Sequence, residues 1–185
     1  MINETNSMTA SRIAILNEES LEKEQLRRCE TGDLFGPEYG NLPNGRFRLL
    51  SRVTLTRYET HPEGLYGMAM AELDLSPDTW FFKNHFFGDP VMPGTLQVEA
   101  VLQLAGLYLA WAGVRGVGRA REVSRTVFYD EIRPDNSTKF RIAMSVIKIL
   151  GRGKLHYLTG SAFGLRDDDK QVMRMEGIKL IKAER

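Results

Sequence analysis

Four residues near the middle of the chain have side chains or backbone groups that could act in one reaction. His85 lies in the aromatic run "WFFKNHFF", and Gly94, Glu99 and Gln103 follow in "PGTLQVEAVLQ". An imidazole titrates near neutral pH, so His85 can accept a proton. Burial of a carboxyl group favours its protonated form, so a buried Glu99 could donate a proton. Gln103 follows Glu99 by four positions, which places both side chains on one helix face, within reach of a hydrogen bond.

Gly94 stands just before the apolar segment, where the Pro-Gly pair predicts the start of a helix. The first N–H groups of a helix have no intrahelical partner and lie at the positive end of its dipole, so they can hold a developing oxyanion. Each feature also has a plain structural explanation. Most helix starts bind nothing, a buried glutamate can be satisfied by its neighbours, and a histidine among phenylalanines is by default a packing or surface residue.

The features fit one reaction when they are combined. A base, His85, removes the proton alpha to a thioester carbonyl, and backbone N–H groups at Gly94 hold the enolate-like oxygen. An acid, Glu99, then protonates the hydroxyl that leaves from the beta carbon. The products are an enoyl thioester and water. Because one group must be deprotonated and the other protonated, we expect a bell-shaped dependence of the rate on pH.

The composition limits the other classes of function. The chain has 185 residues, 42% hydrophobic and 26% charged, which suits one globular domain. A formal net charge of +1 argues against a protein that coats nucleic acid. The single cysteine, Cys29, excludes an intrachain disulfide framework and a cysteine-rich zinc site. With no metal-binding spacing and no phosphate-binding loop, we expect neither a metal nor a cofactor.

The location of the protein is inferred from weaker signals. The N-terminus lacks a basic start followed by an apolar run, so we expect no secretory signal, and a cytoplasmic location fits the single cysteine. Residues 95–113 approach the length of a membrane span, but they include Gln97, Glu99 and Gln103. Ionisable groups in lipid are costly, so we interpret this segment as a helix buried inside the protein and expect no membrane span.

The four candidate residues must be positioned by the elements around them. We predict a first helix that Ser20 caps and that stops at Gly32, and a long apolar helix over residues 95–113. The glycine-rich "GVRGVGRA" after it is predicted to be loop. Strands are predicted at residues 48–58, 65–73, 123–132, 138–150, 154–165 and 172–182.

A helix that is apolar on all sides must be buried on all sides. A sheet curled around the helix satisfies this, so the fold class is α+β. Residues 1–19 are expected to be a flexible N-terminal extension, and residues 20–185 a single domain.

The block "WFFKNHFFGDPVMPGTLQVEA" closely resembles the active-site block of the 3-hydroxydecanoyl-acyl-carrier-protein dehydratase/isomerase family, which has the hot-dog fold. "GDLFGPEYGNLP" and "AELDLSPDTWFF" resemble that family's N-terminal segment and the strand that leads into its site. The resemblance begins at about residue 20 and is looser after residue 121. It implies an antiparallel sheet wrapped around one long central helix, and a homodimer with each active site at the subunit interface.

The resemblance also implies roles for individual residues. His85 matches the catalytic histidine, and Gly94 matches the glycine whose N–H binds the thioester carbonyl. Glu99 stands where this family usually has aspartate, and a glutamate there is typical of the sister 3-hydroxyacyl-carrier-protein dehydratases. Gln103 matches the glutamine that holds this acid, and Val91 in the same block is expected to support the site. His85 and Glu99 can come from different subunits, so they need not meet within one chain.

The activity implied is dehydration of 3-hydroxyacyl thioesters on acyl carrier protein to trans-2-enoyl thioesters, in fatty acid or related acyl-chain biosynthesis. Asn84 and Thr95 replace cysteine or cysteine-like positions of the bifunctional enzymes. With Glu99, these departures leave open whether the chain also isomerises its product to the cis-3-enoyl form. Two further functions stay open, those of a non-catalytic acyl-binding hot-dog module and of a hot-dog thioesterase.

Acyl carrier proteins are acidic, so a basic surface is expected near the mouth of the site. Lys148, Arg152 and Lys154 cluster around the turn "LGRGK", and Lys179 can join them through strand pairing. An ordinary solvated hairpin explains the same charges equally well.

Overall fold

The protein is described by a computed structural model over residues 13–184. Seven strands form one antiparallel sheet in the order β1-β2-β3-β5-β6-β7-β4. The strands are β1 Ala14–Leu21, β2 Arg52–Thr60, β3 Gly67–Asp74, β4 Val117–Phe128, β5 Lys139–Arg152, β6 Leu155–Arg166 and β7 Gln171–Ala183.

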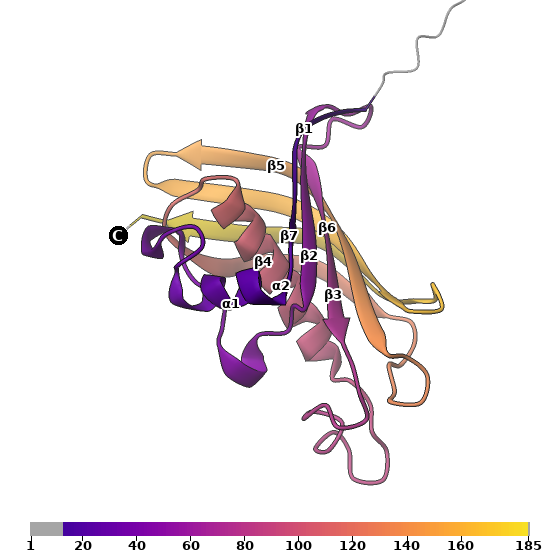
Figure 1. Ribbon diagram of the computed structural model, residues 1–185. Helices are drawn as coiled ribbons and strands as arrows, with labels where there is room; N and C mark the ends of the chain where they lie inside the picture. Colours follow the sequence, from indigo (N-terminus) through magenta and orange to yellow (C-terminus); the bar gives the residue numbers. More distant parts are fainter. Residues whose placement is uncertain (1–12, 185) are drawn as a thin grey trace, which may run out of the picture.

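One long helix, α2 (Gly94–Trp111), lies inside the curve of this sheet (Figure 1). It packs against strands β2 to β7, and most of its side chains are buried. Each turn of the helix therefore contributes apolar area to the core, which explains why its sequence is apolar on nearly every side. The predicted α+β class, a sheet wrapped around one central helix, is confirmed.

Strand β5 shows how the sequence pattern builds the inner face of the sheet. Phe140, Ile142, Met144 and Val146 are all buried, and the residues between them are more exposed. Side chains alternate across a strand, so this pattern places one face against α2 and the other toward solvent. The alternation predicted from the sequence is confirmed here.

Strand β1 corrects the prediction for the N-terminal region. Ser20 does not cap a helix. It lies in β1, where its hydroxyl oxygen is 3.1 Å from that of Thr54 on β2. Residues 14–19, which we assigned to the flexible extension, also belong to this strand, whereas residues 1–12 lie outside the described residues. The strand was missed because it is an edge strand with mostly exposed side chains, so it has no clear apolar alternation.

Helix α1 (Lys23–Thr31) has its N-cap at Glu22, two residues later than the predicted cap, and ends as predicted at Gly32, whose φ is +83°. Its start is stabilised by the Gln25 side chain, which accepts a hydrogen bond from the N–H of Glu22 at 2.8 Å. The chain then continues through two short 3₁₀ turns, Pro37–Tyr39 and Gly45–Phe47.

Strand β4 begins inside the stretch that we predicted to be loop. Residues 117–120 of "GVRGVGRA" pair with β7, so half of that loop prediction is wrong. The strand also ends at Phe128 rather than at residue 132. Cross-strand pairing with β7 sets these limits, and the local glycine content could not reveal it. No helix in the part of the chain described here is long and apolar enough to cross a membrane.

Candidate active site

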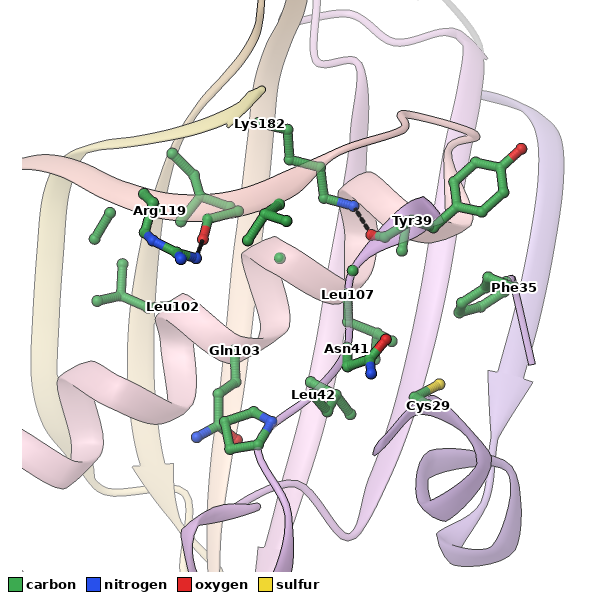
Figure 2. A pocket seen from close by; sticks show the side chains of 18 of the residues that line it. Cys29, Phe35, Tyr39, Asn41, Leu42, Leu102, Gln103, Leu107, Arg119 and Lys182 are labelled. Atoms are coloured by element: carbon green, nitrogen blue, oxygen red, sulfur yellow. Dashed lines mark hydrogen bonds between the residues drawn. The ribbon is translucent and has the colours of Figure 1, made fainter. Parts of the chain in front are cut away.

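A cavity of about 320 Å³ lies beside α2 (Figure 2). Its walls come from α1 and the segment after it, from α2, and from the adjoining strands β4 and β7. The lining is mainly apolar, with polar groups at several points. It comprises Cys29, Phe35, Tyr39–Pro43, Glu99, Leu102, Gln103, Gly106, Leu107, Ala110, Val117–Ala120, Leu180 and Lys182.

Glu99 and Gln103 both line this cavity, one helical turn apart. The Gln103 Nε2 donates to Oε1 of Glu99 at 2.9 Å and to the carbonyl oxygen of Phe47 at 2.8 Å. Its Oε1 accepts the N–H of Leu49 at 3.0 Å. Because the Leu49 N–H needs an acceptor, the amide orientation is determined, and the NH₂ group must face Glu99. The Gln103 amide thus orients one carboxylate oxygen of Glu99, and the other forms no hydrogen bond with the described residues.

His85 lies in the loop before α2, and its own loop fixes its ring. Its Nδ1 is 3.0 Å from the carbonyl oxygen of Val91, and the Val91 N–H donates to the His85 carbonyl at 2.7 Å. A carbonyl can only accept, so Nδ1 carries the hydrogen and Nε2 is left with a free lone pair. The structure therefore places Val91 where it can support His85.

An ion pair that the sequence reasoning missed anchors the same loop. Arg133 Nη2 lies 2.6 Å from Asp89 Oδ1, and Arg133 also pairs with Glu131 at 3.0 Å. Asp89 in turn closes the loop, because its carbonyl accepts the N–H of Phe86 at 2.7 Å. The hydrogen bond that Arg133 donates to Asp89 raises the pKa of Arg133 further above its usual value. No sequence signal links two residues so far apart in the chain.

Gly94 is the first residue of α2, as the resemblance requires. A Cβ atom at this position would lie 2.8–3.2 Å from ring atoms of Phe128, at the end of β4. That separation is shorter than carbon atoms tolerate, so the aromatic ring sits directly over the glycine. Close approach of a flat group to the helix start depends on the absence of a side chain here.

The single chain does not assemble all the candidates. No hydrogen bond joins His85 to Glu99 within residues 13–184, and His85 is not among the residues that line the cavity with Glu99. Asn84 and Thr95 are exposed, and the Asn84 amide donates to the carbonyl of Trp80 at 2.7 Å. The described chain therefore holds two separate parts of the expected site.

The expected basic surface lies on the β5–β6 hairpin and the strand beside it. Lys148 on β5 and Lys179 on β7 both pair with Thr159 on β6, so all three lie in one row across the sheet. Arg152 ends β5, and Lys154 lies in the turn. Lys179 Nζ is 2.8 Å from Glu122, which offsets its charge. In the described range, no such partner lies within ion-pair distance of the other three.

Two titratable groups in the cavity wall were not identified from the sequence. Burial raises the pKa of the Cys29 thiol to about 11, so this thiol is neutral and unreactive at ordinary pH. Lys182 is only 2% exposed, and burial lowers its pKa to about 8. The alternation on β7 contained a signal, because Lys182 shares the inward-facing register of Ile178 and Leu180.

Several solved structures are similar to this chain in backbone structure, at low sequence identity. The crystal structure of S. sahachiroi AziG is 17% identical, with a TM-score of 0.45, over 71% of this chain and 92% of that one. A putative thioesterase, yhdA from Lactococcus lactis, is 8% identical, with a TM-score of 0.48, over 64% and 84% of the two chains. An uncharacterized protein from Erwinia carotovora subsp. atroseptica is 23% identical, with a TM-score of 0.43, over 63% and 84%.

Comparison with protein families gives a more specific result. A family model described as the FabA-like domain matches residues 42–176, which is most of the chain. The matched range includes the loop of His85, the start of α2 at Gly94, and the Glu99–Gln103 pair. The chain belongs to the FabA-like domain family.

Proposed function

We propose that this protein dehydrates 3-hydroxyacyl thioesters on acyl carrier protein to trans-2-enoyl thioesters, in fatty acid or related acyl-chain biosynthesis. One observation carries the proposal. Glu99 faces a largely apolar cavity, and Gln103, itself fixed by two backbone groups, orients its carboxyl group. A carboxyl group held in this way is arranged to exchange a proton with a ligand in the cavity. Membership of the FabA-like domain family supports the same reaction.

In the proposed mechanism, His85 is the base. The contact of its Nδ1 with the Val91 carbonyl leaves Nε2 to take the proton from the alpha carbon of the thioester. The backbone N–H groups at the start of α2, at Gly94, stabilise the negative charge that develops on the thioester oxygen. Glu99 then donates a proton to the departing beta-hydroxyl group, and water leaves.

The proposed active enzyme is a homodimer. His85 and Glu99 occupy separate parts of the described chain, so the mechanism needs His85 of one subunit to approach Glu99 of the other. Exposed aromatic residues around the loop and the end of β4 are available for such an interface. They are Phe86, Phe87, Phe128 and Tyr129. Exposed clusters of large apolar side chains commonly mark interaction surfaces.

The first test is turnover of a medium-chain 3-hydroxyacyl thioester by the purified protein. Formation of the enoyl product is expected, and His85→Ala or Glu99→Gln should each lower the rate by about a hundredfold or more, the scale of lost acid–base catalysis. His61→Ala and Glu63→Gln in the β2–β3 turn are matched controls, because they remove the same groups outside the cavity.

Three results would decide between dehydration and the competing functions. Wild-type rates in both His85→Ala and Glu99→Gln would overturn the assigned mechanism. Release of free thiol in place of an enoyl product would identify a thioesterase, and binding without turnover would identify an acyl-binding module. Chromatographic separation of the 2-enoyl and 3-enoyl products shows whether isomerisation follows dehydration.

A further inference from the structure

Lys182 projects from β7 into the end of the cavity that lies near the C-terminus of α2. Its ammonium group donates a hydrogen bond to the carbonyl oxygen of Tyr39 (Figure 2). It donates a second one to the carbonyl oxygen of Val114, at 3.1 Å. Tyr39 belongs to the segment that covers the cavity, and Val114 follows α2 directly. Two of the three N–H bonds of the ammonium are therefore used on the protein.

The charge of this ammonium is not balanced by the protein. Within residues 13–184, no carboxylate lies within 4.0 Å of the Lys182 Nζ, although the side chain is only 2% exposed. Burying an unpaired charge is costly, and an apolar side chain of similar volume would remove that cost. Buried ionisable groups without a structural counter-charge are found preferentially at functional sites.

A second cation, Arg119, also lines the cavity. Arg119 on β4 follows Gly118, which pairs with Lys182 across the two strands. One Arg119 nitrogen donates to the carbonyl of Gly118 at 2.7 Å, and its other donors form no hydrogen bond with the described residues. The wall of the cavity thus carries two cationic side chains, besides the carboxyl group of Glu99.

The separation between Glu99 and this end matches the size of an extended substrate. Glu99 is in the second turn of α2, and Ala110 is in the last, four residues before Val114, to which Lys182 donates. At a rise of 1.5 Å per residue, the two positions are about 16 Å apart along the helix. A substrate whose beta carbon is at Glu99 could therefore place another group, many bonds away, beside Lys182.

We propose that Lys182, assisted by Arg119, binds an oxyanion that the acyl thioester substrate itself carries, at the opposite end of the cavity from Glu99. This inference rests on the proposed function, because it assigns the cavity to that substrate. Two parts of a substrate have the required chemistry. One is a carboxylate at the far end of the acyl chain, and the other is the phosphate of the phosphopantetheine arm.

The experiment compares three 3-hydroxyacyl thioesters of equal chain length. The first is an N-acetylcysteamine thioester that ends in methyl, the second is its carboxylate-ended counterpart, and the third is the methyl-ended acyl group on phosphopantetheine. The enzymes compared are the wild type, Lys182→Met, Lys182→Arg and the control Lys170→Met, an exposed lysine outside the cavity. The readout is kcat/KM for each thioester.

We expect one anion-bearing substrate to have a kcat/KM about tenfold or more above that of the methyl-ended N-acetylcysteamine thioester. This is the scale of the free energy of a hydrogen bond to a charged group. The carboxylate-ended thioester identifies the acyl chain as the source, and the phosphopantetheine thioester identifies the arm. Lys182→Met should abolish the preference, Lys182→Arg should keep part of it, and Lys170→Met should keep all of it. No preference in the wild type, or a preference that Lys182→Met retains, overturns the proposal.

Failure of the proposed function gives a different result. If no thioester is turned over, calorimetry can still measure binding of the corresponding enoyl thioesters to the wild type. Tighter binding of an anion-bearing thioester, lost in Lys182→Met, would support the anion site without the reaction. Equal binding of all three would reject it. Circular dichroism of each variant, together with the conservative Lys182→Arg, separates loss of the site from loss of the fold.

Discussion

At the scale of single residues, Gln103 joins a backbone segment of the fold to Glu99, the proposed acid. One amide group serves the N–H of Leu49, the carbonyl of Phe47 and the carboxylate of Glu99. The first two partners belong to the segment that crosses over α2, so Gln103 both holds that segment and orients Glu99. A side chain that is 5% exposed cannot exchange these partners for water without local opening.

Gln103→Leu should therefore affect stability and turnover together. It leaves the Leu49 N–H and the Phe47 carbonyl without a partner, which costs about 1–3 kcal/mol for each buried group. For a protein of this size we expect a fall in Tm of at least about 3 °C, together with a reduced kcat. Calorimetry and the enoyl-product assay measure the two effects. Gln171→Leu on the exposed start of β7 is the control, and an unchanged Tm in Gln103→Leu would contradict the role described.

At the scale of elements, the β6–β7 turn is fixed by one carboxylate. Asp167 accepts hydrogen bonds from the N–H of Thr138 at 2.8 Å, its hydroxyl at 2.7 Å and the hydroxyl of Ser137 at 2.9 Å. The Thr138 backbone hydrogen bond, followed by the side-chain ones, lowers the pKa of Asp167 to about 2. The turn is thereby attached to the residues that lead into β5.

This arrangement predicts a pH-dependent effect of Asp167→Asn. The pKa of Asp167 in the folded protein lies below its ordinary value of 3.8. The ionised carboxylate therefore stabilises the fold at pH values above 3.8. The contribution is lost as the pH falls through about 2. At pH 7, Asp167→Asn should lower Tm by about 2–4 °C, and the difference should shrink toward pH 2. Thermal unfolding across this pH range tests it, with the exposed Asp135→Asn as control. A difference independent of pH would contradict the assignment.

The β5–β6 hairpin is the element proposed to meet acyl carrier protein. Lys148, Arg152 and Lys154 have no ion-pair partner in the described range, whereas Lys179 is paired with Glu122. Charge reversal at Arg152 and Lys154 should raise KM for carrier-bound substrate by about tenfold, because long-range charge attraction assists encounter with an acidic partner.

The prediction for the hairpin compares a carrier-bound substrate with a small thioester. An N-acetylcysteamine thioester lacks the carrier, so its turnover by the doubly reversed variant should not change. Reversal of Lys170 and Arg174, near the opposite end of β6, is the matched control. Equal losses with both substrates would reject the hairpin as the docking surface.

At the scale of the whole molecule, β4 is an edge strand of the sheet and carries mostly exposed side chains. Edge strands expose backbone groups that can pair with another chain, so proteins usually cover or protect them. The edge at β4 lies next to the cavity and ends at Phe128, over Gly94. A second copy of the chain at this edge would approach both parts of the candidate site.

The dimer is tested by mixing two inactive variants. His85→Ala and Glu99→Gln chains should each be nearly inactive alone. After subunit exchange, half of the dimers are mixed and each contains one intact site, so about a quarter of wild-type activity should return. Native mass spectrometry verifies the exchange. Verified exchange without recovered activity would show that the two residues do not meet across the interface.

The sequence alone determined the centre of this protein. The apolar run around Glu99 predicted α2 to within a few residues, because burial on all sides requires apolar side chains on all sides. The alternation in β5 likewise predicted a half-buried strand. The candidate residues were found because His85, Gly94, Glu99 and Gln103 stand close together in the chain, where spacing on a helix and in its preceding loop is a local property.

Only the tertiary structure decided the features that depend on distant residues. Strand β1 exists because β2 pairs with it, although its own side chains are mostly exposed. The Asp89–Arg133 ion pair and the backbone bonds of Gln103 join segments more than forty positions apart. The inward-facing register of Lys182 on β7 is a local pattern, but its contacts with Tyr39 and Val114, and the lack of a carboxylate partner in residues 13–184, follow only from the fold. Pattern and propensity are local, whereas burial and pairing are fixed by the whole fold.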